Sequence, residues 1–138
     1  ATPSEEIAVK FLLLTRHNAS ETAVAPMTEW DPADAEAHLA ALRAINAQLT
    51  ESGELLTMQA LADPASARIV HGLEAGSPIV TDGPYPESTE LFAGYQLVDV
   101  VDEDRAVEIA AQVAAAPGPG GKPINNRIEV RAVMFTWE

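Results

Sequence analysis

Residues 92–101 read FAGYQLVDVV, and Asp102 follows them directly. Apolar and polar side chains alternate along this stretch well enough to predict a β-strand. Asp102 has the side chain of a helix N-cap, and the pattern of residues 103–116 predicts an amphipathic helix behind it. The stretch therefore predicts a strand that passes directly into a helix.

A similar strand and helix lie near the start of the chain. Residues 7–15 are apolar and rich in β-forming side chains, which predicts a first strand. Residues 16–30 predict a long loop and a candidate lid. Asp31 and Pro32 are typical of an N-cap and first helical position, and the helix should end before Gly53. The apolar stripe of this helix is Leu39, Leu42, Ile45 and Leu49.

The remaining segments complete an α+β order of elements. Residues 54–61 predict a strand, residues 66–73 and 77–82 a hairpin, and residues 127–135 a last strand. The expected inner stripe of the second helix is Val107, Ala110, Val113 and Ala114. The order β-α-β-(ββ)-β-α-β predicts a ferredoxin-like antiparallel sheet with two helices on one face. Because one apolar sheet face would stay bare, we expect a homodimer in which two sheets pack together.

Composition narrows the class of protein. The 138 residues predict a single domain over residues 1–138, with residues 1–6 expected to form a disordered N-terminal tail. With no cysteine, disulfides, thiolate zinc sites and cysteine nucleophiles are excluded. A net charge of −13 argues against nucleic acid and anionic membranes as partners.

No apolar run has the roughly 18 residues of a membrane span. The polar, acidic start carries no signal peptide pattern, so we expect a cytoplasmic protein.

Two further stretches carry a resemblance to a known family. Residues 80–90 read VTDGPYPESTE, with Gly94 and Tyr95 shortly after, and residues 128–133 read IEVRAV. They are similar to the V-T-D-G-P-F-x-E-x-K-E and I-E-V-R-P-V patterns of the YCII-related (DGPF-domain) proteins. The resemblance covers residues 9–134, counting the opening strand. This chain has Tyr85 where phenylalanine is usual and Thr89 where lysine is common.

The resemblance implies a bacterial protein with the dimeric α+β-barrel fold. It implies no particular reaction, because the family is largely without one. Its members are often linked with sigma-factor systems, which suggests a regulatory protein partner. The YCII-like branch has a histidine in its first helix, in a motif similar to residues 38–42 of this chain, which read HLAAL.

His38 is a candidate catalytic residue. It lies on the same helical stripe as Leu42, Ile45 and Leu49, so its ring should point towards the sheet. One interpretation is a core histidine bonded to a backbone carbonyl or to Asp34. The other is a general acid or base in a cleft between this helix and the sheet.

Asp82 is the second candidate catalytic residue, since it ends a strand and precedes Gly83. Its carboxylate could hydrogen-bond the amides of the turn, or it could serve as an acid or base in a pocket. Tyr85 and Glu90, in the same motif, are candidate substrate-binding residues. The spacing of the three histidines is not that of a metal site, and we expect neither metal nor cofactor.

Arg131 is the third candidate, as an anchor for a ligand carboxylate. It shares a face of the last strand with Glu129, so a surface ion pair is the alternative. Two functions are therefore considered. The first is a protein that binds a small acidic molecule, with or without cofactorless acid/base chemistry. The second is a non-enzymatic dimeric interaction module in a regulatory system.

Overall fold

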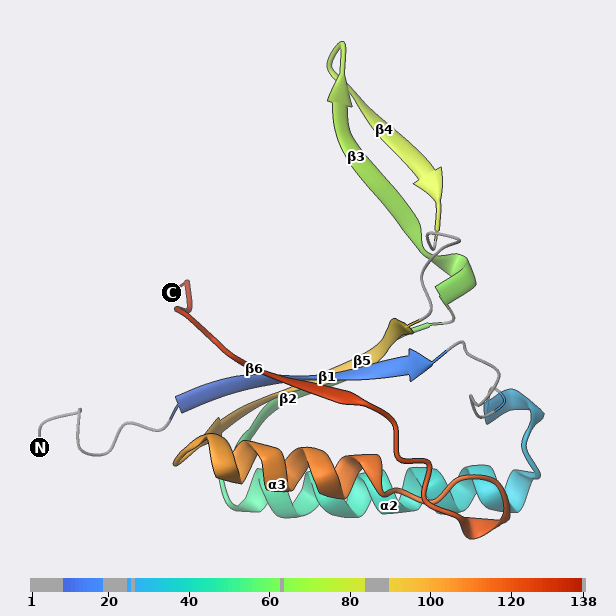
Figure 1. Cartoon of the computed structure of the whole chain (residues 1–138), viewed down its shortest axis with the longest axis vertical. Helices are drawn as coiled ribbons and strands as arrows, with labels where there is room; N and C mark the ends of the chain where they lie inside the picture. The colour runs from blue at the N-terminus through green and yellow to red at the C-terminus, as the bar shows by residue number, and fades with distance from the viewer. Residues whose placement is uncertain (1–8, 19–24, 26, 63, 84–89, 138) are drawn as a thin grey trace, which may run out of the picture.

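The computed structural model describes residues 9–18, 25, 27–62, 64–83 and 90–137, which form a sheet with both helices on one face (Figure 1). The sheet has four antiparallel strands in the order β2-β5-β1-β6. These are β1 (Val9–Asn18), β2 (Leu55–Ala60), β5 (Glu90–Val100) and β6 (Ile128–Ala132). The helices are α2 (Pro32–Glu51) and α3 (Glu103–Ala114). This arrangement confirms the predicted ferredoxin-like α+β fold. None of the helices in the described segments is long and apolar enough to cross a membrane.

Both ends of α2 follow the local signals in the sequence. The Asp31 carboxylate accepts a hydrogen bond from the Ala33 amide at 3.2 Å. At the other end, Gly53 has φ 83°, its amide donates to the Thr50 carbonyl at 3.1 Å, and the Glu54 amide donates to the Leu49 carbonyl at 2.8 Å. This is the Schellman ending, in which a left-handed glycine satisfies the last carbonyls of a helix.

The first strand is longer than expected, because β1 continues to Asn18. Of the predicted loop, the structure also describes Ala25 and the short 3-10 helix η1 (Met27–Glu29). The expected tail over residues 1–6 lies outside the described residues.

The buried face of α3 agrees with the predicted stripe at Ala110 and Val113 but not at Val107. Asp102 caps the helix, as predicted, by accepting from the Arg105 amide at 2.9 Å. Ala106, Ile109 and Ala110 are buried, whereas Val107 is 49% exposed. Ile109, the largest buried side chain of α3, lies two residues from Val107, so a helix that buries Ile109 turns Val107 away from the sheet.

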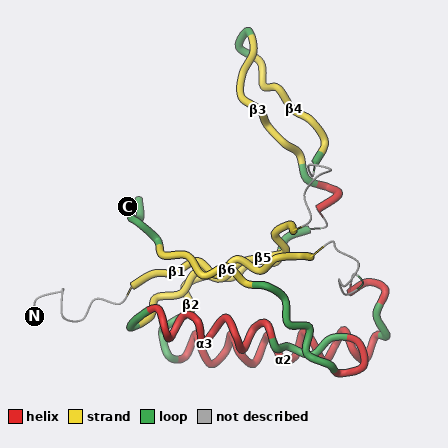
Figure 2. The backbone as a smooth tube through the Cα atoms, viewed as in Figure 1, coloured by secondary structure: helices red, strands yellow, loops and turns green. Residues whose placement is uncertain are grey.

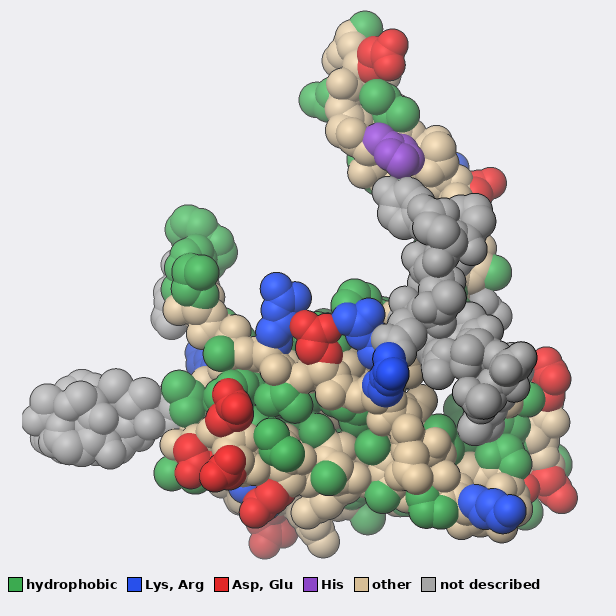
Figure 3. Space-filling model, viewed as in Figure 1, with side chains coloured by type: hydrophobic (Ala, Val, Ile, Leu, Met, Phe, Trp, Pro, Cys, Tyr) green, Lys and Arg blue, Asp and Glu red, His purple; other side chains and the backbone are tan. Residues whose placement is uncertain are grey.

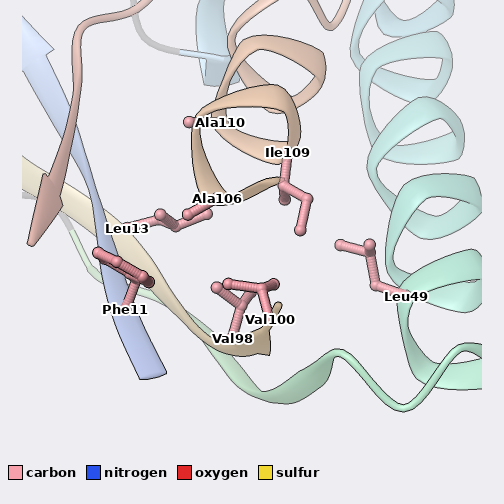
Figure 4. Close-up of a cluster of buried hydrophobic side chains, with 8 residues drawn as sticks. All are labelled: Phe11, Leu13, Leu49, Val98, Val100, Ala106, Ile109 and Ala110. Atoms are coloured by element: carbon pink, nitrogen blue, oxygen red, sulfur yellow. The ribbon is translucent and has the colours of Figure 1, made fainter. Parts of the chain in front are cut away.

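The core lies between the helices and one face of the sheet (Figure 4). Leu13, Val98 and Ile109 have no exposed surface at all, and Val100 and Leu49 are nearly as deeply buried. Beside this core, the buried Gln96 amide donates to the Asn46 side-chain oxygen at 2.9 Å, which ties β5 to α2. The complete buried cluster is Phe11, Leu13, Leu49, Val98, Val100, Ala106, Ile109 and Ala110.

The opposite face of the sheet, which we call the open face, carries no helix (Figure 1). Side chains alternate along a strand, so Leu12 and Leu14 of β1 point away from the core that holds Leu13. Leu12 is paired with Leu97 and Leu14 with Tyr95, so these four side chains form an apolar stripe along the open face. All four are only partly buried.

The predicted hairpin forms, but it leaves the body of the domain. Strands β3 (Arg68–Glu74) and β4 (Ser77–Asp82) make a separate two-stranded sheet, which we call the arm. Ala75 (φ 51°) and Gly76 (φ 83°) form its turn, as a type I′ connection requires. Two further short 3-10 helices are present, η2 (Pro64–Ser66) at the base of the arm and η3 (Pro119–Gly121) before β6. The arm projects on the same side as the open face (Figure 2).

An ion pair fastens the N-terminal end of α3 to the turn after α2. Arg105 donates to both carboxylate oxygens of Glu54, through Nε at 2.8 Å and Nη2 at 2.9 Å. The hydrogen bond from Arg105 lowers the pKa of Glu54, and the Ser52 hydroxyl and the charge of Arg105 lower it further. Burial acts in the opposite direction but does not outweigh these contacts.

We predict that Glu54→Gln destabilises the protein by about 1 kcal/mol at neutral pH. The folded pKa of Glu54 lies below its ordinary value of 4.5, so the contribution is present above that value and is lost as the pH falls through the folded pKa. Urea unfolding of wild type and variant should therefore converge once the pH has fallen below the lowered folded pKa of Glu54. Glu74→Gln, in the arm, is the control, and an equal loss in both variants would contradict the prediction.

Candidate functional site

His38 lies between α2 and the segment that leads to η3. Its Nδ1 is 3.0 Å from the Pro117 carbonyl oxygen, and its ring meets the Trp30 ring edge-on with the centroids 5.4 Å apart. A carbonyl oxygen can only accept, so Nδ1 carries the proton and donates it. The structure therefore gives His38 the backbone-carbonyl contact that the first interpretation expected, and the catalytic role stays a prediction.

Asp82 lies at the end of β4, at the base of the arm, and its side chain is 94% exposed. Its nearest described cation is Arg68, whose Nε is 3.9 Å from the Asp82 carboxylate. Tyr85 lies outside the described residues, and so does the side chain of Glu90.

Arg131 extends from β6 on the open face, since Val130 beside it packs against the core. It lies 3.4 Å from Glu129 and its side chain is 71% exposed. His38 is on the helix side of the same sheet, and Asp82 is on the arm (Figure 1). The structure thus does not bring the three predicted site residues together.

Arg131 belongs instead to a group of basic side chains at the edge of the open face, which we call the arginine cluster: Arg16, Arg127 and Arg131. Arg16 pairs with the Glu129 carboxylate, and its guanidinium also lies 4.7 Å from the centre of the Phe92 ring. The Arg16 amide donates to the Arg127 carbonyl at 2.9 Å, which places the ends of β1 and β6 side by side. Figure 3 shows basic side chains gathered around an acidic one on this edge.

Two residues of the cluster, Arg16 and Arg127, border an open depression of about 420 Å³. Its lining residues are Arg16, Arg127, Ile128 and Glu129. The hydrogen bond from Arg16 lowers the pKa of Glu129, and the charges of Arg16 and Arg131 lower it further. Glu129 therefore stays ionised at neutral pH and holds Arg16 and Arg131 beside each other.

The arrangement can bind an anion. Guanidinium groups form paired hydrogen bonds with carboxylates, and those of Arg16 and Arg131 both contact the Glu129 carboxylate here. A positive cluster is conspicuous on a chain whose net charge is −13. The apolar stripe of Leu12, Leu14, Tyr95 and Leu97 adjoins the arginine cluster on the open face.

The sequence alone missed Arg16 and Arg127 as site residues. The sequence predicts a first strand that ends at Thr15, which places Arg16 in the following loop. The signal was present, since Leu12, Leu14 and Arg16 continue one alternation and Arg127, Glu129 and Arg131 form another. Among the described residues, no three histidine, aspartate or glutamate side chains come together as metal ligands do.

Comparison with known proteins identifies what this chain is similar to. The model of the YCII-related domain matches residues 9–118. An uncharacterised protein of Rhizobium meliloti is 29% identical over 106 residues, which cover 77% of this chain and 81% of that protein. The resemblance seen in the sequence is thereby confirmed, and no reaction comes with it.

We predict that His38→Ala destabilises the protein by about 1–2 kcal/mol, because the Pro117 carbonyl loses its donor. His38→Gln can still donate from its amide and should recover part of this loss. The check is urea unfolding of both variants, with ¹⁵N NMR of the wild-type ring to test that Nδ1 holds the proton. Unchanged stability in His38→Ala would show that the contact is not structural.

Proposed function

The chain belongs to the YCII-related family, and we propose that it acts as a homodimer that binds a small carboxylic acid at the arginine cluster. The observation that carries the proposal is the position of Arg16, Arg127 and Arg131 beside an apolar stripe on an uncovered sheet face. The acid's carboxylate would meet the guanidinium groups, and its apolar body would lie along the stripe.

The uncovered apolar side chains of the open face support the homodimer. Leu12, Leu14, Tyr95 and Leu97 form one continuous apolar surface with no covering element among the described residues. A second copy packed face to face would bury this surface together with the acid's apolar body and would cover the open depression. Closure would also exclude water from the arginine cluster, which strengthens a guanidinium–carboxylate contact.

The site differs from the cleft expected from the sequence. Core side chains lie between the helices and the sheet, with Leu13, Val98 and Ile109 fully buried. His38 is in α2, on the helix side of the sheet, and Asp82 ends β4 in the arm, so the proposal is binding and includes no proton transfer by these two residues.

Arg131→Gln should weaken the binding of hexanoate about tenfold, because one charge-assisted contact is lost. Glu129→Gln should strengthen it several-fold, since Arg16 and Arg131 lose their internal competitor. Isothermal titration calorimetry with hexanoate at low ionic strength measures both effects. Added salt should reduce the affinity for hexanoate.

The matched control is Arg43→Gln, which removes an exposed arginine from α2 whose partner is Glu36. It should leave hexanoate binding unchanged. Acetate, which has the same carboxylate without the apolar body, should bind more weakly than hexanoate if the stripe contributes. Equal losses in Arg131→Gln and Arg43→Gln, or no hexanoate binding at all, would overturn the proposed site.

A further inference from the structure

A β-bulge turns Phe92 towards the open face. Phe92 and Gln96 are four residues apart in β5, so in a regular strand both would point into the core, where Gln96 is buried. The pairing of β1 with β5 shifts between Thr15 and Arg16, so that Phe92 becomes the partner of Arg16. The Arg16 guanidinium consequently lies 4.7 Å from the centre of the Phe92 ring. Bulges are common next to binding sites, where they redirect a side chain.

The bulge brings two aromatic side chains to the open face three residues apart. Tyr95 pairs with Leu14 and Phe92 with Arg16, and these two residues of β1 are on the same face of their strand. Both rings are accessible, since Phe92 is 43% exposed and Tyr95 is only partly buried. The apolar stripe therefore has an aromatic end beside the arginine cluster.

Across the sheet from the arginine cluster, β2 presents hydrogen-bonding side chains. Gln59 pairs with Tyr95 and Thr57 with Leu97, so both extend on the open face. The exposed Gln59 amide donates to the Thr57 hydroxyl at 3.4 Å. With β1 and β5 between them, β2 and β6 are roughly 14 Å apart. A flat ligand that covers the two inner strands would therefore reach from an arginine to the Gln59 amide.

Along β1, the apolar area ends after two rows. Lys10 pairs with Asp99 at one end, and Arg16 pairs with Phe92 at the other. Because Lys10 and Asp99 have opposite charges, their row carries no net charge, whereas the three arginines of the arginine cluster outnumber Glu129. An anionic group is thus attracted to the arginine cluster. Successive rows are about 7 Å apart, so the area between the two ends accommodates a single ring.

We propose that the acid bound at the arginine cluster is aromatic: a single-ring aryl alkanoic acid with a hydrogen-bonding substituent opposite its acidic chain. This rests on the proposed function and adds the chemical class of the ligand. The ring would lie over Leu14 and contact the rings of Tyr95 and Phe92 edge-on or offset, as aromatic groups prefer. The substituent would meet the side chain of Gln59.

The first test compares two acids with the same carboxylate and chain, 3-phenylpropanoate and 3-cyclohexylpropanoate. A purely aliphatic surface would favour the cyclohexyl acid, which is the more apolar of the two. Aromatic contacts should instead favour the phenyl acid about two- to tenfold in isothermal titration calorimetry. Tyr95→Leu should remove this preference and keep hexanoate binding, which shows that the variant is folded. Phe92→Leu, at an exposed position, should reduce the preference as well.

The second test concerns the substituent. In the wild type, 3-(4-hydroxyphenyl)propanoate should bind several-fold more tightly than 3-phenylpropanoate, because its hydroxyl gains a hydrogen bond. Gln59→Leu should abolish this gain. Gln112→Leu is the matched control, since it removes an exposed glutamine from α3 on the helix side of the sheet, and it should retain the gain.

The outcomes separate the aromatic ligand from the proposed site. If hexanoate binds but the cyclohexyl acid binds as well as the phenyl acid or better, the aromatic ligand is overturned and the site at the arginine cluster stands. A phenyl preference that survives both Tyr95→Leu and Phe92→Leu would also overturn it, because the ring would then lie elsewhere. A hydroxyl gain that survives Gln59→Leu would overturn the contact with Gln59. No binding of hexanoate or of either ring acid would overturn the site and the inference together.

Discussion

Ile109 of α3 and Leu49 of α2 pack on the face of the sheet that holds Leu13 and Val98, and this contact decides which sheet face becomes the core. Because side chains alternate along a strand, burying Leu13 and Val98 commits Leu12, Leu14 and Leu97 to the other face. A shift of β1 by one residue would exchange the two sets. The apolar stripe, the arginine cluster beside it and the side on which a second copy can pack are all consequences of that single choice of register.

Much of the fold was predictable because its decisive signals are local. Asp31, Asp102 and Gly53 each act within one helical turn, and the turn of the hairpin depends on two residues. The predictions that were wrong depend on contacts between residues that are far apart in the sequence. The end of β1 depends on pairing with β5, which no property of Arg16 itself reveals. Val107 and Ile109 both suit a helix interior, and only the sheet beneath α3 selects between them.

The candidate site could be predicted only in part, since Arg131 was recognised and its neighbours were not. A binding site made from the ends of two strands requires the sheet order, and β1 and β6 are more than a hundred residues apart in the chain. His38 and Asp82 are candidates in the sequence because of the chemistry that each residue type can perform. The structure gives His38 a backbone carbonyl and Asp82 full exposure, and those surroundings decide what a side chain is positioned to do.

The arm also has a consequence for how this chain can change over evolution. It departs after β2 and returns into β5, and these two strands are direct neighbours in the sheet. Residues can therefore be added to or removed from the hairpin in pairs without altering strand order, helix packing or the core. The entropic cost of a longer excursion grows only with the logarithm of its length. The length and the sequence of the arm can therefore vary while the fold of the domain stays the same.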